Sequence, residues 1–543
     1  MNHPPASEDA QVAVVGAGPV GMTLAGRLAQ HGVRVVLLEQ GPRLSGEGSK
    51  AICMQRETLE IWARLGIGET VAQRGVQWHT GRTYFRDREL FSVELPHSPD
   101  DHFPPFVNIS QTEVEDLLLQ RLEELPQVDL RWSHRLVGIA QDARGVTLTC
   151  DTPEGSRELR VGYLVGTDGA HSSVRHLLGQ GFPGPSHADL FLICDIRAQL
   201  PFPKERRLFF DPPWNPGRQV LVHPQPDGVW RIDWQVPPET DVDDERRSGG
   251  LDRRIRAVVG ESTPYRLEWV TAYRFHQRCV ERFRIGRVLL AGDAAHLMSP
   301  FGARGLNSGA ADAENLAWKL AAVTDGNAPD QLLDSYQRER RAVALHNLAL
   351  TDRTMRFMVP HGPIRRAARN TILSGSVRLP ALRRRVDSGR LSEPPVYPAP
   401  QGSDRSGASG LAQTGAVAPD VACRRLGTSR ERVSRLRELV GNGFMVLVAQ
   451  PGDPEAAAAA TVRAARLAWP APVRVVAMGP DRALRGAVVL APDHGEAVQP
   501  YCADGARAWL VRPDGHLAGS VRLDGPAAID QLARLQAAAL TAT

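Results

Sequence analysis

A glycine-rich turn near the start of the chain constrains the fold more than any other feature. Val12 to Val15 is predicted to be a short buried strand, and the turn Gly16 to Gly21 follows it directly. A helix is predicted from Pro19 to Gln30, and a second strand from Arg34 to Leu38 ends at Glu39. A strand, a glycine turn, a helix and a strand in this order form a βαβ unit, which indicates a parallel sheet covered by helices.

Each of the three glycines in the sequence GAGPVG has its own task in such a turn. Gly16 permits the tight turn, Gly18 lets a pyrophosphate approach the backbone at the helix N-terminus, and Gly21 lets helix and strand pack closely. Glu39 lies where a carboxylate can accept the ribose hydroxyls of a dinucleotide, and it disfavours the 2′-phosphate of NADP. The turn is therefore predicted to bind FAD or NAD; a turn without a ligand is the competing interpretation.

Two further segments place glycine beside an acidic residue at the end of a strand. Val161 to Gly166 is a predicted strand that leads into Asp168, and the serines that follow can cap a helix. A second predicted strand ends at Ala291, directly before Gly292 and Asp293, and a helix is expected to start at Ala310. Asp293 can bind the ribityl hydroxyls of a flavin. Main-chain amides can surround the flavin pyrimidine edge at Gly302, Gly305, Leu306 and Asn307.

Together, GAGPVG, GTDGAHSSVR and GDAAHLMSPFGARGLNSG resemble the motifs of class A flavoprotein monooxygenases, the FAD-dependent aromatic hydroxylases. The resemblance covers roughly residues 10 to 350 and is strongest to the phenol hydroxylase and 3-(3-hydroxyphenyl)propionate hydroxylase branch. It implies FAD as the bound cofactor and NADH or NADPH as co-substrate. The cofactor-binding residues implied by the motifs and the resemblance are Gly16, Gly18, Pro19, Gly21, Glu39, Gln40, Lys50, Arg56, Gln111, Asp168, Gly292, Asp293, Pro300, Gly302, Gly305, Leu306 and Asn307.

The same resemblance, with the composition along the chain, predicts an α/β (α+β) domain organisation. A Rossmann-like FAD-binding domain is expected in two parts, residues 10–190 and residues 276–390 with its helices. Short alternating segments predict an inserted, mostly antiparallel β-sheet domain for the substrate at 191–275. A linker rich in Pro, Gly and Ser is expected at 391–415. Residues 416–543 resemble a thioredoxin-like domain but contain no CxxC, so no dithiol chemistry is expected there.

The reaction implied by the resemblance is the hydroxylation of a phenolic aromatic substrate with O₂, through a flavin C4a-hydroperoxide. No metal is required. Catalytic candidates are Pro300, Arg304, His223 and Tyr273, and substrate candidates are Trp234, Gln235 and His223. A structural role competes with each of these assignments. Two other functions stay open: epoxidation or Baeyer–Villiger-like oxidation of a polyketide on the same fold, or a non-catalytic FAD-fold protein that binds a partner.

Arg304 and the histidines need separate interpretation. Arg304 stands where many members of the family have a neutral glutamine, and it can stabilise anionic reduced flavin, meet an acidic substrate or face solvent. His223 is a candidate proton acceptor on a strand next to Trp234. His296 lies inside the third motif, and we interpret it mainly as a structural residue.

Composition narrows the partners. The chain has 65 Lys and Arg against 61 Asp and Glu, a balance that predicts neither a nucleic-acid nor a membrane partner. The 6 cysteines are scattered, so we expect neither disulfides nor a zinc site but a reducing cytoplasm. The polar N-terminus lacks the apolar core of a signal peptide, and no apolar run is long enough to span a bilayer. A homodimer is a candidate assembly.

Overall fold

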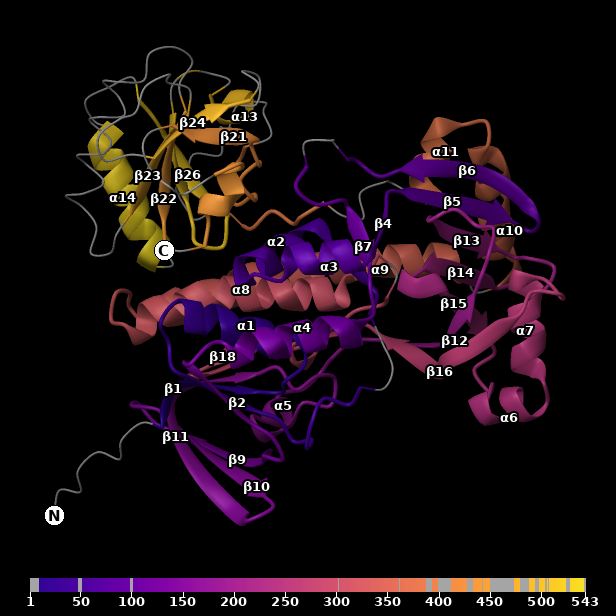
Figure 1. Cartoon of the computed structure of the whole chain (residues 1–543), viewed down its shortest axis with the longest axis horizontal. Helices are drawn as coiled ribbons and strands as arrows, with labels where there is room; N and C mark the ends of the chain where they lie inside the picture. The colour runs from indigo at the N-terminus through magenta and orange to yellow at the C-terminus, as the bar shows by residue number, and fades with distance from the viewer. Residues whose placement is uncertain are drawn as a thin grey trace. The chain divides into compact units, whose positions relative to one another are not determined.

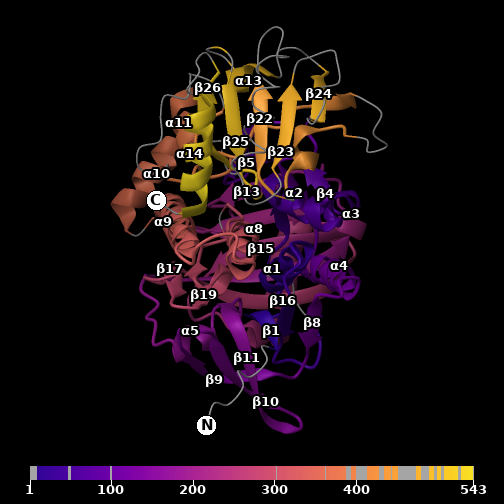
Figure 2. The same cartoon turned by 90° about the vertical axis from the view of Figure 1, so that its left-hand side faces the viewer.

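A computed structural model gives the fold, which Figures 1 and 2 show from two directions. It describes residues 9–46, 51–97, 101–300, 302–360, 362–386, 393–398, 412–426, 433–441, 443–449, 473–478, 488–493, 498–502, 505, 507–523 and 528–541. The chain divides into two compact units. Unit 1 comprises 1–26, 36–312 and 344–393, and unit 2 comprises 27–35, 313–343 and 394–543. The helical residues 313–343 thus group with the C-terminal part of the chain, a division that sequence composition did not suggest.

The first sheet of unit 1 contains the predicted βαβ unit. Its strands are β1 (Ala10–Val15), β2 (Val35–Leu38), β8 (Val128–Arg131), β9 (Arg135–Gln141), β10 (Val146–Thr152), β11 (Gly155–Gly166), β18 (Arg284–Ile285) and β19 (Val288–Leu290). The main path runs β18-β19-β11-β1-β2-β8, and α1 (Pro19–Gln30) follows β1. Because β1, β11 and β19 run parallel, their carboxyl ends meet at one edge. The turns that follow these three strands are the three predicted motifs.

The second sheet of unit 1 confirms the predicted antiparallel sheet and extends it. Its strands, in spatial order, are β16 (Tyr265–His276), β12 (Ser186–Ala198), β15 (Val229–Val236), β14 (Gln219–Pro224), β13 (Arg206–Phe210), β5 (Thr80–Phe85) and β6 (Arg88–Glu94). All neighbouring strands are antiparallel except β13 and β5. β5 and β6 come from the first part of the chain, so the sheet is not confined to the predicted insertion.

The two faces of β15 have different surroundings. Trp230, Ile232 and Trp234 lie in a hydrophobic core with residues of α7 (Gly250–Val259), which follows α6 (Val242–Arg247). Figure 1 shows α6 and α7 beside this sheet. Alternate residues of a strand point to opposite faces, so Asp233 and its neighbours along the strand lie on the other face. The tryptophans are therefore core residues, and the polar set is the one that can meet a ligand.

Unit 1 also contains helices, a small three-stranded sheet and a two-stranded sheet of β17 (Arg278–Cys279) and β20 (His296–Leu297). The three-stranded sheet has the order β3 (Cys53–Gln55), β7 (Phe106–Asn108) and β4 (Val76–Trp78). The helices are α2 (Arg56–Leu65), α3 (Gly68–Arg74), α4 (Gln111–Glu123), α5 (Ser173–Leu177), α8 (Gly305–Thr324), α9 (Leu332–Met358), α10 (Pro363–Ser376) and α11 (Pro380–Val386), of which α8 and α9 continue into unit 2. None of the described helices is long and apolar enough to cross a membrane.

The predicted start of α8 at Ala310 is wrong, because the helix begins at Gly305. A Cβ added at Gly309 would lie 2.5 Å from Cγ2 of Val20 in α1, and one added at Gly292 would lie 3.1 Å from the same atom. The glycine at 309 therefore serves close packing inside a helix. Its presence in the sequence suggested a loop because glycine is a poor helix former.

Unit 2 contains a mixed sheet in the order β21 (Cys423–Leu426), β24 (Val488–Pro492), β23 (Arg474–Met478), β22 (Met445–Ala449), β25 (Arg507–Val511) and β26 (Leu517–Arg522). Figure 2 shows α14 (Ala528–Thr541) alongside β25 and β26, and the short α13 (Gln499–Cys502) also contacts β25. The apolar segments that begin near residues 444, 473 and 508 form β22, β23 and β25. Trp318 of α8 packs against Phe444, with ring centroids 5.4 Å apart.

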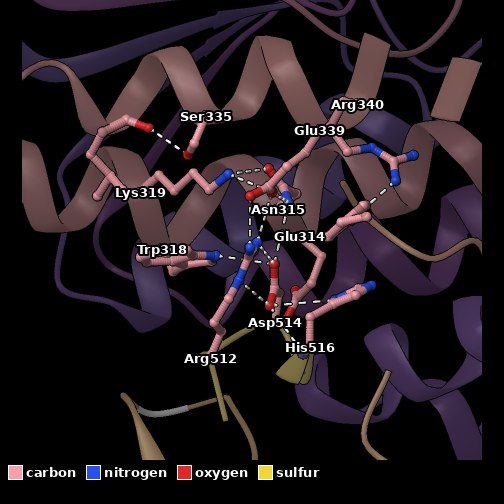
Figure 3. Close-up of polar contacts among 12 residues, drawn as sticks. Glu314, Asn315, Trp318, Lys319, Ser335, Glu339, Arg340, Arg512, Asp514 and His516 are labelled. Carbon is pink, nitrogen blue, oxygen red and sulfur yellow. Dashed lines mark hydrogen bonds and ion pairs between the residues drawn. The ribbon is translucent and has the colours of Figure 1, made fainter. Parts of the chain in front are cut away.

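A buried charge cluster joins helices α8 and α9 to the turn between β25 and β26 (Figure 3). We define this charge cluster as Lys319, Glu339, Arg512 and Asp514. Both Arg512 and Lys319 donate to the Glu339 carboxylate, over distances of 2.7 to 2.9 Å, and Arg512 also pairs with Asp514. All four residues are buried, and their formal charges cancel.

Candidate active site

In the first glycine turn, the space around each glycine fits the task predicted for it. A Cβ on Gly16, whose φ is +102°, would lie 2.7 Å from Cα of Asp168, and a Cβ on Gly21 would lie 1.9 Å from the Gly16 carbonyl oxygen. A Cβ on Gly18, by contrast, would meet no atom within 4 Å. Gly16 and Gly21 are thus required by the fold itself. Gly18, just before the first turn of α1, borders open space, where a phosphate could approach the backbone.

Glu39 lies at the end of β2 and faces this turn. Its Oε2 accepts a hydrogen bond from the Ala17 N–H at 2.9 Å, and its Oε1 accepts one from the Gly41 N–H at 2.9 Å. A carboxylate has about four lone-pair positions, so two remain for the hydroxyls of a ribose. The backbone fixes the orientation of the carboxylate beside the glycine turn.

Asp168 belongs to the second turn, and its carboxylate forms hydrogen bonds with neighbouring protein groups. It accepts hydrogen bonds from the Ser172 hydroxyl at 2.5 Å and from the Val174 N–H at 3.1 Å, near the start of α5. Burial raises its pKa, against the lowering by these hydrogen bonds. Arg175, in the same segment, donates to the Ala294 carbonyl at 3.1 Å. The second turn therefore supports both the first turn and the third.

The third turn is held by a carboxylate that sequence reasoning missed. Asp312 of α8 accepts hydrogen bonds from the Gly292 N–H at 3.0 Å and from His296 Nε2 at 2.7 Å. Asp312 and His296 are both buried. Their pairing ties the strand end to α8, which agrees with a structural role for His296. An aspartate two residues into an apolar helical stretch was the available signal.

The start of α8 combines a fastened side chain with open backbone groups. The Asn307 carboxamide accepts from the Gln55 N–H at 2.9 Å and donates to the Cys53 carbonyl at 2.9 Å, so it links α8 to β3. The first N–H groups of a helix have no acceptor within the helix. A Cβ on Gly305 would meet nothing within 4 Å, which leaves the space before these N–H groups open.

Arg304 lies beside this helix start, but its side chain does not extend into solvent. Nη1 donates to Asn347 Oδ1 of α9 at 2.6 Å, and the residue is partly buried. Burial lowers its pKa, and no ion pair with an acidic side chain is found for it among the described residues. Arg304 is thus a partly desolvated cation with no paired carboxylate within the described ranges. Asp293 and Pro300, in the same motif, are exposed.

The remaining predicted cofactor residues are more scattered. Arg56 donates to the Phe103 carbonyl at 2.8 Å and pairs with Asp101 at 2.8 Å, so part of its guanidinium already binds protein. Gln111 donates to Glu115 at 2.8 Å. Pro19 begins α1, and Gln40 is exposed. Lys50 lies outside the described residues. Cofactor contact stays a prediction for all of them.

A polar patch lies on the face of the second sheet that is turned away from α7. Arg231 forms a bidentate pair with Asp195, with distances of 2.8 and 2.7 Å, and Asp195 also accepts from Gln225 at 3.1 Å. The strand registers place Asp233 between Ile193 and Leu221 on this face. We refer to Asp233, Arg231 and His223 as the polar sheet patch.

His223 lies in this patch, but it is a poor proton acceptor. Burial, helped by the charges of Arg206 and Arg231, lowers its pKa to about 3. Its Nδ1 lies 3.9 Å from Sγ of Cys53, whose backbone carbonyl binds Asn307. The imidazole is therefore neutral near pH 7 and can position a ligand, whereas accepting a proton there is unfavourable.

The other substrate candidates fall on different faces. Gln235 and Tyr273 flank Phe191 in the strand register and share the face of the polar sheet patch. Burial raises the pKa of Tyr273, and the charge of Asp293 raises it further, which places the phenol within electrostatic range of the third motif. Trp234 is enclosed in the core against α7, so a ligand could contact it only by entering that core.

These features fit FAD in kind and in arrangement. The open approach at Gly18 suits a pyrophosphate, the oriented Glu39 suits a ribose, and the open helix start at Gly305 suits the electron-rich pyrimidine edge of a flavin. Among the described residues, no group of three or more His, Cys, Asp or Glu could hold a metal ion.

The chain is similar in sequence to known proteins. A family model described as FAD binding domain matches residues 9–351. A 3-(3-hydroxy-phenyl)propionate/3-hydroxycinnamic acid hydroxylase of Comamonas testosteroni is 32% identical over 394 residues, which span 72% of this chain and 66% of that protein. A para-nitrophenol 4-monooxygenase of Pseudomonas sp. (strain WBC-3) is 35% identical over 341 residues, which span 62% of this chain and 83% of that protein.

A solved structure extends the similarity to the C-terminal part of the chain. The ternary complex of aklavinone-11 hydroxylase with FAD and aklavinone superposes with a TM-score of 0.77 at 26% identity, covering 99% of this chain and 100% of that one. The family match covers more than half of the chain, and the predicted FAD motifs lie inside it. The chain therefore belongs to the FAD-binding family of flavin-dependent aromatic monooxygenases.

Proposed function

We propose that this protein hydroxylates a phenolic aromatic compound, using FAD as bound cofactor, O₂ as oxidant and NADH or NADPH as reductant. The observation that carries the proposal is the meeting of three glycine turns at one sheet edge, linked through Cys53 to a polar patch on the second sheet. FAD, once bound and reduced, supplies an electrophilic oxygen atom derived from O₂. The chain's own groups bind the flavin, orient the phenol and accept the proton of its hydroxyl.

In this proposal the flavin is held along the sheet edge. Backbone N–H groups near Gly18 would bind the pyrophosphate, Glu39 the adenosine ribose, and Asp293 the ribityl chain. The N–H groups at Gly305 and Leu306 would face the pyrimidine edge, where negative charge collects when the flavin is reduced. Arg304 adds a positive charge beside that position, because it forms no ion pair with a carboxylate in the part of the chain that the structure describes.

The substrate would lie between the third motif, at the start of α8, and the second sheet. Tyr273 and Gln235 border one end of the polar face, and His223 lies at the other end beside Cys53. Mixed apolar and polar lining suits an aromatic ring with one hydroxyl, and exclusion of water would protect the oxygen-transfer step from wasteful peroxide release. Assembly as a homodimer stays a prediction.

A polycyclic phenol is a second substrate class, favoured by the full-length similarity to aklavinone-11 hydroxylase. The relatives that are named for single-ring phenols have higher sequence identity to this chain, but they cover a smaller part of it. Both substrate classes require the same type of reaction, so the two proposals differ only in the size of the phenol that is hydroxylated.

The test is a substrate panel on the purified yellow protein. Single-ring phenols, polycyclic phenols and non-phenolic aromatics would be compared for NAD(P)H oxidation, peroxide release and product mass. Coupled gain of one oxygen atom with aromaticity retained supports hydroxylation. Loss of aromaticity or ring expansion would support epoxidation or Baeyer–Villiger-like chemistry instead. A colourless protein that does not bind added FAD would contradict the proposal.

A further inference from the structure

We propose that Asp233 is the group that accepts the proton of the substrate's phenolic hydroxyl during hydroxylation. This assignment rests on the proposed function and adds a catalytic residue that the sequence motifs do not contain. Asp233 lies at the middle of β15, on the face turned away from α7. The strand registers set it between Ile193 of β12 and Leu221 of β14, so apolar side chains flank it within its row.

The carboxylate of Asp233 is enclosed but not satisfied. Its Oδ1 is buried, yet no hydrogen-bond partner for it occurs in the described part of the chain. Protein surrounds the residue, although part of the residue's surface stays accessible. Cys53 has the same combination of depth and accessible surface. Buried carboxylate oxygens in proteins almost always have partners, so an unpartnered one beside accessible surface indicates a ligand position.

Two contacts connect this position to the third FAD motif. The Cys53 carbonyl accepts a hydrogen bond from Asn307 of the motif, while the Cys53 thiol lies 3.9 Å from His223 on the sheet face. The charge of Asp233 also acts on the Cys53 thiol, which places both groups in the same electrostatic environment. Asp233 therefore faces the space between the sheet and the segment expected to hold the flavin ring.

The charged neighbours favour a base that works near neutral pH. Burial raises the pKa of Asp233 to about 7, Arg231 opposes this rise, and Asp195 adds to it. Arg231 is already paired with Asp195 in a bidentate contact and so compensates Asp233 only in part. The other titratable or charged groups around it are Cys53, Cys194, His223 and Arg206.

His223 is the alternative acceptor, and its electrostatics argue against it. Burial and two arginines lower its pKa to about 3, so protonated His223 is unfavourable at neutral pH. Cys53 is a further alternative, but burial raises the pKa of its thiol to about 12. A general base works best when its pKa lies near the operating pH, which selects Asp233 from the three.

The step proposed for Asp233 transfers one proton and no net electrons. The oxidation of the ring is carried by the oxygen atom that FAD and O₂ would supply. As the ring carbon forms a bond to this oxygen atom, the bond from that oxygen to its leaving group breaks, and the leaving group takes the electron pair. In the same step the phenolic O–H bond breaks, and its electron pair moves into the ring. The proton forms a new O–H bond on the Asp233 carboxylate. Asp233 becomes neutral, and it returns the proton to solvent or product when the active site opens.

The experiment compares the wild-type holoenzyme with Asp233→Asn, which keeps the shape, and Asp233→Glu, which keeps the base. Asp243→Asn is the matched control, because Asp243 is an exposed carboxylate on α6 of the same domain. The first readout needs no turnover. Binding of phenol to the oxidised enzyme, followed by the flavin spectrum from pH 5.5 to 8.5, should tighten several-fold through about pH 7 in the wild type, since ionised Asp233 accepts the stronger hydrogen bond. Binding to Asp233→Asn should not change with pH.

The second readout is coupled hydroxylation. We expect Asp233→Asn to slow product formation by about 10²-fold or more while NAD(P)H oxidation continues with peroxide release. The defect should shrink for p-nitrophenol as the pH rises, because this more acidic phenol arrives already ionised. Asp233→Glu should recover part of the rate, and Asp243→Asn should match the wild type.

The outcomes separate the two proposals. If the wild type binds and oxidises phenol, and Asp233→Asn keeps the pH profile and the coupling of the wild type, only the assignment of Asp233 is overturned. An equal defect for both phenols at every pH would assign Asp233 a structural role and would also overturn it. Failure of the wild type to bind or oxidise any phenol would overturn the proposed function. FAD content and thermal unfolding, measured on every variant, show whether a loss comes from misfolding.

Discussion

Replacing Glu339 by Gln is expected to destabilise unit 2 more than any single surface change. Glu339 lies at the centre of the charge cluster in Figure 3. It accepts two hydrogen bonds from Arg512, at 2.7 and 2.9 Å, one from Lys319 at 2.8 Å and one from Asn315 at 2.8 Å. Glutamine has nearly the same shape, but its amide group would present a donor to these donors. The substitution therefore removes a charge without creating a cavity.

The magnitude follows from the burial of the partners. In the wild type, Lys319 and Arg512 are balanced by Glu339 and Asp514, and the variant leaves one positive charge in excess. Breaking a buried ion pair by removing one partner typically costs about 3–5 kcal/mol. For a domain of this size, that corresponds to a fall in Tm of about 6–20 °C.

Lys319 gives this prediction a pH signature. Burial lowers the pKa of Lys319 to about 8, against the raising effect of Glu339, so removal of Glu339 should lower that pKa further. The lysine can then lose its proton and relieve the excess charge. The destabilisation by Glu339→Gln should therefore be largest near pH 6 and smaller near pH 9. The decrease is limited to about 1.4 kcal/mol per pH unit.

The assay is hydrogen exchange read on peptides of 507–523, together with thermal unfolding at both pH values. Asp244→Asn is the control, since its exposed pair with Arg247 should contribute less than about 1 kcal/mol. The double variant Lys319→Met with Glu339→Gln should recover stability relative to the sum of the single changes. A Glu339→Gln protein within about 1 kcal/mol of the wild type at pH 6, or one with no pH dependence, would refute the reasoning.

Three further predictions concern unit 1. Asp312→Ala removes the acceptor of the Gly292 N–H and His296, so we expect a loss of about 1–3 kcal/mol and weaker FAD retention, measured by flavin release on dilution, with exposed Asp325→Ala as control. Arg304→Gln should lower the flavin reduction potential on the order of 30 mV, equivalent to about 1.4 kcal/mol for two electrons, in dye-equilibration measurements; an unchanged potential would mean that the arginine serves only packing. Ion-pair contacts with Glu60 and Glu69 raise the pKa of His102 to about 9, so the stabilisation that they contribute is complete below about pH 6.5 and disappears as the pH rises through about 9. Denaturant unfolding between these pH values should lose stability in the wild type but not in His102→Gln, and parallel curves would contradict this.

The sequence by itself determined the parts of the molecule that depend on short-range patterns. The strand, turn and helix around Gly16 follow from local apolar runs and from positions that only glycine can occupy. The parallel order of β1, β11 and β19 brings three such turns to one edge, which a βαβ reading already implies. The FAD-binding assignment therefore needed little more than the three motifs and their spacing.

The tertiary structure decided what depends on contacts between distant segments. Alternation along β15 places its residues on two opposite faces, but only packing against α7 revealed that the tryptophans form a core and that Asp233 lies on the other face. The pairing of Glu339 with Arg512 spans 173 residues, and no local pattern marks either residue as a partner. Propensity and periodicity act over a few residues, whereas burial and charge pairing are set by the whole fold. The pKa of Asp233 is raised by burial in the folded protein, which no local sequence pattern specifies.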